Sequence, residues 1–444
     1  MSDYETRKNR LSEQMRRAGS VRLGKETSNL FRKREASNEN TLSVRDFNHV
    51  LAVNPAEGWV EVEGMTTYAD LLDATLVHNV MPAVLPELKS ITVGGAVSGT
   101  GLESSSFRYG FVHETILEVD ILLSDGRVVT CTPENEYSDL FFGIPNSYGT
   151  LGYILKTKVR TIPVKPYVKM QHLKFSDPAA LFSAMKDYSG RSDIDFIDGA
   201  IHGKDYYIMT AGTFSDAAPY LSDYTYKNIY YRSQQARDED YLTTKDYLWR
   251  WDTDWFWCSN VIHAQNPFVR RLLGRKRLNS LFYSKLMRLN QRWRITERLQ
   301  PIFGASTEEW VIQDSEIPVE KAAGYVEFFH REISTKPIAI GPVRCPTPQN
   351  RFPLFPLKPL ALYINIGFYG SVPAAKNKVM GYFNRLVEKK TMELGGIKML
   401  YSDAYYTKDE FWKIYDKPTY DTLKEKYDPQ KKLRGLYEKC VERQ

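Results

Sequence analysis

The most informative stretch of this chain is PELKSITVGGAVSGTGLESSSFRYG, residues 86–110. It holds five glycines, interleaved with seven serines and threonines. Because glycine lets the backbone approach a ligand closely and adopt positive φ, successive N–H groups can converge on phosphate oxygens. Hydroxyl groups add further directed donors, so the loop suits a pyrophosphate. An ordinary structural loop of the same composition is the alternative.

Two common phosphate-binding motifs are excluded. The chain has no GxxxxGK[ST] loop, and the glycines of residues 86–110 do not follow the G-x-G-x-x-G spacing between a strand and a helix. The loop therefore predicts neither a P-loop nucleotidase nor a Rossmann dinucleotide site.

Short strands surround this loop. Residues 50–54, 59–64, 118–123, 127–131 and 151–162 have β-rich patterns, and residues 67–79 space their apolar side chains as a helix does. The Ser124-Asp125-Gly126 turn predicts a hairpin between two of these strands. Pro163 and Pro166 indicate a domain boundary near residue 165.

After residue 165, the sequence patterns alternate between helix and strand. We expect helices at 268–300 and 373–389, strands at 205–211, 310–313 and 361–368, and a charged, mostly helical tail at 408–442.

Composition restricts the class of protein. With 444 residues, 42% hydrophobic, 26% charged and 13% aromatic, the chain is typical of globular proteins and not of disordered or fibrous ones. It has no run of about 18 apolar residues and no secretory-signal pattern at the N-terminus. Four widely spaced cysteines form neither a metal motif nor a disulfide framework, which predicts a cytoplasmic protein without a metal site.

The net charge of +6 is unevenly placed. Ten Lys or Arg stand against two Glu between Arg7 and Arg34, and ten stand against one between Arg270 and Arg298. The first cluster is interpreted as a cradle for an anionic cofactor and the second as a contact for an anionic surface; solvated surface is the alternative for both.

A family resemblance appears at several separate points. The segments at 85–110, 124–133 and 138–154, together with KMLYSDAYYTKDEFW (398–412) and, more loosely, GASTEEWVIQDSEIP (304–318), resemble the vanillyl-alcohol oxidase or PCMH-type FAD flavoproteins. Within them the chain looks most similar to Δ24-sterol reductases (24-dehydrocholesterol reductases). It is also similar to bacterial flavoproteins that reduce 10-methylene fatty-acyl chains; the lack of an N-terminal anchor helix favours this second group.

The resemblance implies noncovalent FAD, because the segment at 21–32 has no histidine to carry a covalent flavin. NADPH is implied as the electron donor. The implied cofactor-binding residues are Lys25, Thr27, Ser28, Asn29, Ser90, Thr92, Val93, Gly94, Gly95, Ser98, Gly99, Gly101, Ser104, Ser105, Gly149, Gly152 and Ile154.

Reduction of an unactivated double bond needs a proton donor in a dry, electron-rich pocket. An extended strand at 401–406 would place Tyr401, Asp403 and Tyr405 on one face, so these are the first candidates. Glu308 follows, with Glu309 and Asp314 beside it. Simple packing and solvation remain the alternative for each residue, and His113 is interpreted as structural.

The segment WRWDTDWFW (249–257) holds four of the eight tryptophans and precedes a basic stretch with an apolar helical stripe. A contact between residues 249–299 and an anionic membrane fits this pattern. A Trp-rich interior with a charged outer helix fits it as well. No motif supports nucleic-acid binding.

We therefore predict an α+β protein with two lobes. A PCMH-type FAD-binding domain spans 1–165, a substrate or cap domain with a mixed sheet and helices spans 166–407, and a helical segment at 408–444 returns to the first domain. The predicted function is FAD-dependent reduction of a lipid C=C bond, in a cytoplasmic protein with or without peripheral membrane contact. An FAD-linked oxidase or dehydrogenase of a hydroxyl substrate and a non-catalytic lipid-binding module are the alternatives. The sequence makes no prediction of oligomeric state.

Overall fold

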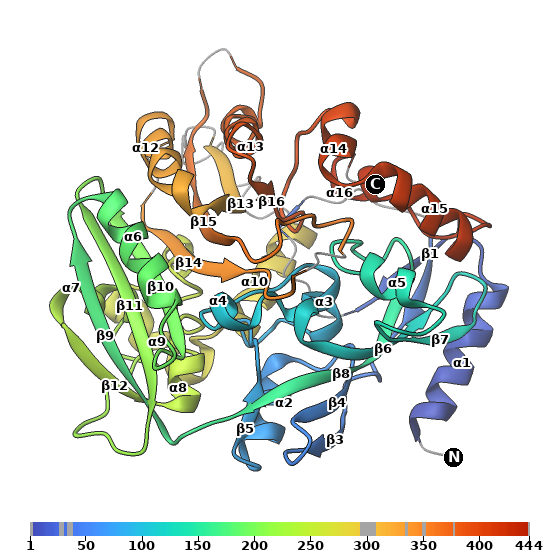
Figure 1. The fold of residues 1–444 in the computed structure, drawn as a ribbon, viewed down its shortest axis with the longest axis horizontal. Coiled ribbons are helices and arrows are strands. Elements are labelled where there is room, and N and C mark those ends of the chain that lie inside the picture. Colours follow the sequence, from blue (N-terminus) through green and yellow to red (C-terminus); the bar gives the residue numbers. More distant parts are fainter. Residues whose placement is uncertain are drawn as a thin grey trace.

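The computed structural model describes residues 3–25, 31–32, 39–293, 308–333, 336–348, 352–375 and 378–442, without the side chains of 290–293. It contains a six-stranded sheet, an eight-stranded sheet and a two-stranded parallel pair (Figure 1). Helices accompany both large sheets, which confirms the α+β class.

The six-stranded sheet has the order β3-β4-β8-β6-β7, with β5 pairing β8. Its strands are β3 (Val50–Asn54), β4 (Trp59–Glu63), β5 (Val80–Pro82), β6 (Ile116–Leu122), β7 (Val128–Cys131) and β8 (Tyr153–Pro163). The predicted hairpin is confirmed: β6 and β7 pair antiparallel, and Gly126 takes the positive φ of 86° that its turn requires.

Four helices belong to this part of the chain: α2 (Tyr68–Leu76), α3 (Val93–Ser98), α4 (Ser106–Tyr109) and α5 (Ser138–Gly143). The predicted helix at 67–79 is α2, which Thr67 caps by accepting a hydrogen bond from the Asp70 N–H. The N-terminal α1 (Asp3–Arg17), which the sequence reasoning missed, precedes β1 (Val21–Gly24) and β2 (Asn40–Ser43).

The chain passes from one large sheet to the other between Pro163 and Tyr167. The eight-stranded sheet has the order β12-β9-β11-β10-β14-β15-β13-β16, and its described strand pairs are antiparallel rather than mixed. Its strands are β9 (Tyr167–Phe175), β10 (Phe196–Gly203), β11 (Tyr206–Ser215), β12 (Glu239–Thr243), β13 (Glu308–Pro318), β14 (Ile338–Arg344), β15 (Leu362–Pro373) and β16 (Ile397–Lys398).

The helices of this lobe are α6 (Pro178–Ser189), α7 (Tyr230–Ala236), α8 (Thr244–Leu248), α9 (Pro267–Leu273), α10 (Ser280–Trp293), α12 (Ala322–Glu332) and α13 (Tyr382–Glu393). The expected helix at 268–300 is interrupted, because Gly274 ends α9 with a positive φ of 68°. The helix predicted at 373–389 lies further along the chain, because β15 runs to Pro373 and α13 begins only at Tyr382.

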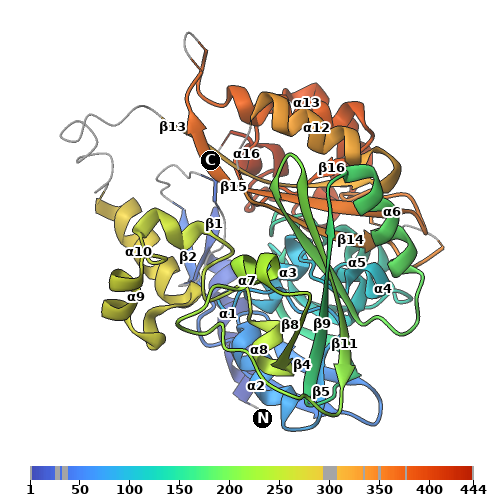
Figure 2. The same ribbon diagram turned by 90° about the vertical axis from the view of Figure 1, so that its left-hand side faces the viewer.

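The tail is helical as predicted, in α14 (Lys408–Ile414), α15 (Lys417–Tyr427) and α16 (Leu436–Cys440). It lies against the first lobe: the Tyr427 hydroxyl donates to Asp139 at 2.6 Å, and Lys424 donates to the Thr150 carbonyl at 2.8 Å. Figure 2 places α12 and α13 on one side of the molecule and α9 and α10 on another.

Candidate functional site

A cavity of about 580 Å³ lies between the two large sheets. The glycine-rich loop and the turn before β8 line it from the first lobe, and strands β10, β13, β14 and β15 line it from the second. Residues Met399 and Tyr401, near the C-terminal tail, complete the wall. The site is therefore built from segments that are far apart in the sequence.

Close backbone packing explains two glycines of the loop. The Gly94 N–H donates to the Gly64 carbonyl at 2.8 Å, and a Cβ at Gly94 would lie 2.9 Å from that same oxygen. A Cβ at Gly99 would lie 2.9 Å from the Gly95 carbonyl. Larger residues would push the loop away from the sheet, so these glycines hold its backbone at the cavity wall.

Most of the predicted cofactor residues meet at this cavity. Those that line it are Lys25, Ser90, Thr92, Gly94, Gly95, Ser98, Gly99, Gly101, Ser104, Gly149, Gly152 and Ile154. Val93 and Ser105 are instead buried behind the loop, where the Ser105 hydroxyl donates to the Ala83 carbonyl at 2.6 Å. Thr27, Ser28 and Asn29 lie outside the described residues.

The residues of the cavity fit FAD. Besides the carboxylate oxygens Glu87 Oε1 and Asp198 Oδ1, three buried atoms on its wall that can donate have no hydrogen-bond partner among the described residues: Arg32 Nη2, Tyr148 Oη and Tyr401 Oη. Buried polar groups are normally satisfied, so these atoms fit a ligand rich in acceptors. Arg22 and Lys25 add positive charge to the same wall, which suits a pyrophosphate.

The other described residues of the N-terminal basic cluster do not line the cavity. Arg7 pairs with the buried Glu63, and Arg10 pairs with Asp46. Lys33 and Arg34 lie outside the described residues. The cationic contribution to the cavity from the described part of this cluster thus comes from Arg22, Lys25 and Arg32.

A carboxyl group and two tyrosines form a second polar region of the cavity. Asp314 of β13 accepts hydrogen bonds from the Tyr369 hydroxyl of β15, at 2.8 Å to Oδ1 and 3.0 Å to Oδ2. Burial raises the pKa of Asp314. Burial and the nearby Asp314 charge raise the pKa of Tyr369 and Tyr401 well above the usual range. Burial thus disfavours the charged form of all three groups.

Glu316 lies two residues along the same strand. It is fully buried, and burial raises its pKa to about 8. Its Oε1 accepts from Asn365 Nδ2 at 2.8 Å, while Oε2 has no partner among the described residues. Asn365 itself lines the cavity. Glu316 does not itself line the cavity, and Asn365 connects it to the wall, so β13 carries two nearby carboxyl groups for which burial disfavours ionisation.

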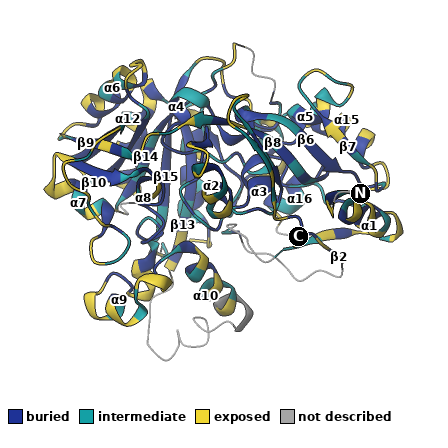
Figure 3. Ribbon diagram, turned by 90° about the horizontal axis from the view of Figure 1, so that it is seen from below, coloured by how far each residue is buried: buried dark blue, intermediate teal, exposed yellow. Residues whose placement is uncertain are grey.

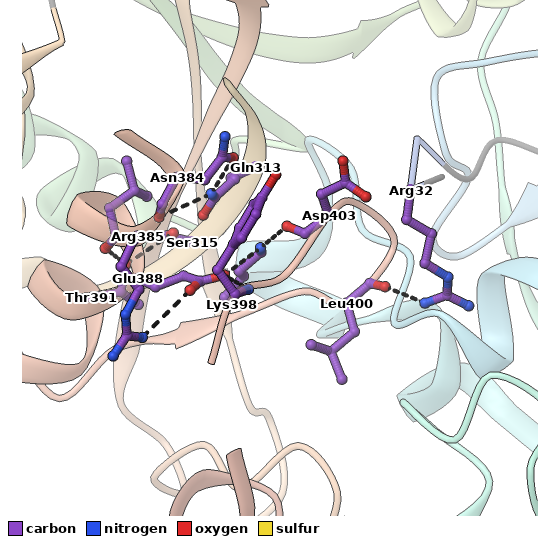
Figure 4. Close-up of polar contacts among 12 residues, drawn as sticks. Arg32, Gln313, Ser315, Asn384, Arg385, Glu388, Thr391, Lys398, Leu400 and Asp403 are labelled. Atoms are coloured by element: carbon purple, nitrogen blue, oxygen red, sulfur yellow. Dashed lines mark hydrogen bonds and ion pairs between the residues drawn. The ribbon is translucent and has the colours of Figure 1, made fainter. Parts of the chain in front are cut away.

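The strand expected at 401–406 was wrong. Residues 401–407 have turn or irregular backbone, because the side chain of Lys398 and the carboxylate of Glu388 hold them in place. Lys398 donates to Glu388 at 3.1 Å and to the Asp403 carbonyl, and the Tyr405 N–H donates to Glu388 at 2.9 Å (Figure 4). Without strand alternation, the three candidate side chains need not share a face.

Of the four catalytic candidates, only Tyr401 lines the cavity. Asp403, Tyr405 and Glu308 are not on its wall, and Glu308 is exposed at the start of β13, where it accepts from Ser371 at 2.6 Å. Asp314, a secondary candidate from sequence, is on the wall. Tyr369 and Asn365 were missed, since their register opposite β13 is a tertiary feature.

The four tryptophans of 249–257 are buried. Trp251, Trp255 and Phe256 line the cavity, and Trp251 donates from Nε1 to Asp198 at 2.9 Å. The interior interpretation of this block is therefore the correct one for its tryptophans. They make the cavity wall aromatic, as an electron-rich pocket requires.

His113 is structural, as interpreted. It is buried and stacks on Phe111 at a centroid distance of 5.4 Å, and burial lowers its pKa to about 3. It does not line the cavity. The part of the chain that the structure describes also holds no cluster of His, Cys, Asp and Glu suited to a metal ion.

Known proteins are similar to most of this chain. A family model for an FAD-binding domain matches residues 17–132. Human Delta(24)-sterol reductase is 30% identical over 404 residues, which cover 88% of this chain and 75% of that protein. The Arabidopsis thaliana Delta(24)-sterol reductase is 25% identical over 417 residues, covering 86% and 73%. Rice cytokinin dehydrogenase 7 is 29% identical over 150 residues, covering 33% and 28%.

Proposed function

The chain belongs to the family of Delta(24)-sterol reductases and is an FAD-dependent oxidoreductase, and from this premise we propose that it reduces an unactivated C=C bond of a lipid with NADPH as the electron donor. The observation that carries the proposal is the pair of Asp314 and Tyr369 in an aromatic cavity shared with the glycine-rich loop. The substrate class is a sterol-like or fatty-acyl lipid.

The reaction breaks the π bond and forms two C–H bonds, one from a hydride and one from a proton. When FAD is bound, it supplies the hydride, and NADPH replaces the two electrons. The chain must supply the proton. Asp314 suits this role because it lies on the cavity wall and burial raises its pKa, which favours its protonated form relative to that of an exposed carboxyl.

The side chains around Asp314 support its role as the proton donor. Tyr369 holds the Asp314 carboxyl in a fixed orientation, and Tyr401 adds a neutral hydroxyl to the same wall. Trp251 and Trp255 exclude water and offer aromatic faces to positive charge developing on the alkene.

A second candidate is an FAD-linked dehydrogenase or oxidase of a hydroxyl substrate; the match to cytokinin dehydrogenase 7 supports the dehydrogenase class and not the hydroxyl substrate. Such a reaction needs a general base. Burial of Asp314 disfavours its ionised form, which is the form that a base needs, so we rank this function second. A lipid-binding module without catalysis is a third candidate.

Anaerobic spectroscopy of the purified protein separates the three. We expect NADPH to bleach the yellow flavin and an unsaturated lipid to restore the colour. Bleaching by an alcohol in place of NADPH supports the dehydrogenase, and a protein that takes up no FAD contradicts both enzymes. We also propose that FAD is noncovalent, in which case acid precipitation leaves the flavin in the supernatant.

Replacing Asp314 tests the proton donor. In Asp314→Asn we expect unchanged bleaching by NADPH and reoxidation by lipid slowed by about 10²- to 10⁴-fold, because the amide cannot donate the proton. Glu308→Gln, at the exposed start of the same strand, is the matched control and should retain the wild-type rate. Equal reoxidation rates in Asp314→Asn, Tyr401→Phe and wild type would remove both residues from the mechanism.

A further inference from the structure

Helix α9 exposes large apolar side chains and buries a charged one, which is the reverse of an ordinary helix at a water-exposed surface. Its outer side presents Phe268 and Leu272, which are 77% and 74% exposed. Its buried residue is the charged Arg270, whose guanidinium pairs with Asp254 at 2.5 and 3.0 Å. Burying a paired charge while exposing two large apolar side chains is unfavourable in water, so this surface is suited to an apolar environment.

Local sequence fixes this arrangement. Asn266 caps α9 by accepting from the Phe268 N–H at 2.9 Å, and Pro267 occupies the first turn. Phe268 and Leu272 are four residues apart and therefore lie on one side of the helix. Other exposed apolar side chains lie nearby in sequence, so we define the α9–α10 apolar surface as Val261, Ile262, Phe268, Leu272, Leu281 and Leu289.

Figure 3 shows α9 and α10 projecting from the body, with many exposed residues along α9. None of the described helices is both long and apolar enough to cross a membrane. A short helix with exposed apolar side chains and nearby cations suits insertion into a membrane from one side, at the level of the headgroups.

The charge of residues 255–290 indicates which kind of lipid surface these helices would fit. Residues 255–290 contain seven Lys or Arg and no Asp or Glu. Arg270 forms an ion pair with Asp254, and Arg275 pairs with Asp223 at 2.7 Å. Arg271, Lys276, Arg277 and Lys285 remain exposed in the same segment. Exposed apolar side chains and exposed cations on one segment complement an anionic lipid surface.

The apolar surface is attached directly to the cavity wall. Ser280, which begins α10, accepts a hydrogen bond from the Ser90 N–H at 3.2 Å. Tyr283 of α10 stacks on Trp255 at 5.9 Å and 17°. Ser90 and Trp255 both line the cavity. A membrane held by α9 and α10 would thus lie next to the elements that enclose the cavity.

We propose that α9 and α10 dock this protein on an anionic membrane, with Phe268 and Leu272 inserted between the lipid headgroups and the exposed cations on the phosphates. Delivery of a lipid from that membrane to the cavity rests on the proposed function. The docking itself does not, because it follows from the surface alone. The tryptophans of 249–257 support the surface from inside and do not meet the lipid.

Vesicle binding by the full chain tests the proposal without turnover. We expect sedimentation with phosphatidylcholine vesicles that contain phosphatidylserine, and much weaker binding to phosphatidylcholine alone or at high salt. Phe268→Ser with Leu272→Ser should lower the partition coefficient by more than about tenfold. Arg271→Gln with Lys276→Gln and Arg277→Gln should lower it by about fivefold per charge removed.

Matched controls separate docking from general effects. Val77 and Val379 are 76% and 83% exposed at other places, so Val77→Ser with Val379→Ser should bind vesicles as wild type does. Lys321→Gln with Lys389→Gln, in the neighbourhoods of α12 and α13, controls for net charge. Retained flavin absorbance verifies folding of each variant.

Two outcomes would overturn the proposal. In the first, wild type does not bind the anionic vesicles, or the α9 variants bind as well as their controls. In the second, light scattering finds a dimer that Phe268→Ser with Leu272→Ser dissociates while vesicle binding is unchanged, which would assign the surface to a second copy of this chain.

Discussion

Asp314 and Tyr369 can form their hydrogen bonds because the residue beside them has no side chain. Asp314 of β13 lies opposite Gly367 of β15 in the antiparallel register. A Cβ at Gly367 would lie 2.5 Å from Asp314 Oδ1 and 2.7 Å from Tyr369 Oη. The glycine thus creates the space in which the carboxyl and the phenol meet.

We therefore expect Gly367→Ala to lower the rate of lipid reduction by more than about tenfold, since displacement of catalytic groups by an ångström costs up to about 10². Binding of FAD should persist. The measurement is single-turnover reoxidation of the reduced protein by lipid.

Gly324→Ala in α12 is the control for this substitution. A Cβ at Gly324 would meet no atom within 4 Å, so the change should leave the rate unaltered and raise the free energy of unfolding by about 0.5–1 kcal/mol. A wild-type rate in Gly367→Ala would contradict the role of this space.

At the scale of elements, a buried ion pair shapes the segment that carries Tyr401. The side chains of Lys398, in β16, and Glu388, in α13, are both fully buried and lie 3.1 Å apart. Glu388 also accepts from the Tyr405 N–H at 2.9 Å. Desolvation lowers the pKa of Lys398, although the Glu388 charge opposes this. The pair fixes residues 399–407 as an irregular loop.

Removing one partner should be more harmful than removing both charges. Lys398→Met leaves the buried Glu388 with only Arg385, whose Nη1 lies 3.6 Å from Oε2, as a counter-ion. Breaking a buried pair typically lowers the free energy of unfolding by about 3–5 kcal/mol, and Arg385 should reduce this loss. Lys398→Met with Glu388→Gln should recover much of this loss, because no buried charge remains and the glutamine oxygen still accepts from Tyr405. Urea unfolding of both variants measures the difference.

Equal or greater loss in the double variant would indicate that the hydrogen bonds of Glu388, rather than its charge, hold the loop. These contacts also explain why the predicted strand does not form. The alternation of Tyr401, Asp403 and Tyr405 predicts a strand, but Lys398 and Glu388, which lie outside this segment, bind its backbone instead.

At the scale of the whole molecule, Arg250 joins the two lobes. Its Nη2 lies 2.6 Å from Asp198 Oδ2 of β10 and 2.8 Å from Glu87 Oε1 beside the glycine-rich loop. The guanidinium has no exposed surface and lies 3.9 Å from the centre of the Tyr247 ring. Glu87 and Asp198 both line the cavity.

We expect Arg250→Lys to weaken FAD binding and to lower the free energy of unfolding by about 1.5–3 kcal/mol, as loss of a buried hydrogen bond that involves a charged group does. A lysine keeps the positive charge, but it loses the hydrogen bond that Arg250 Nη1 donates to the Tyr247 carbonyl at 2.8 Å and the stacking of the guanidinium on the Tyr247 ring. Flavin release during thermal unfolding reports both effects in one experiment.

Arg191→Lys is the matched control, because Arg191 also pairs with an aspartate, Asp193, at 2.7 Å but on the surface. It should leave unfolding and flavin release unchanged. Unfolding of Arg250→Lys at the wild-type midpoint would show that the two lobes do not depend on this contact.

The sequence alone determined the glycine-rich loop, the β6–β7 hairpin and the FAD chemistry, because these rest on short segments whose backbone needs are local. The tertiary structure decided the polar wall of the cavity. Asp314, Tyr369 and Tyr401 meet through strand register and a buried ion pair, which connect residues far apart in the chain. It also moved the tryptophans inside and turned the apolar residues of α9 outward, since the pairing of Arg270 with Asp254 sets which side of that helix faces the protein.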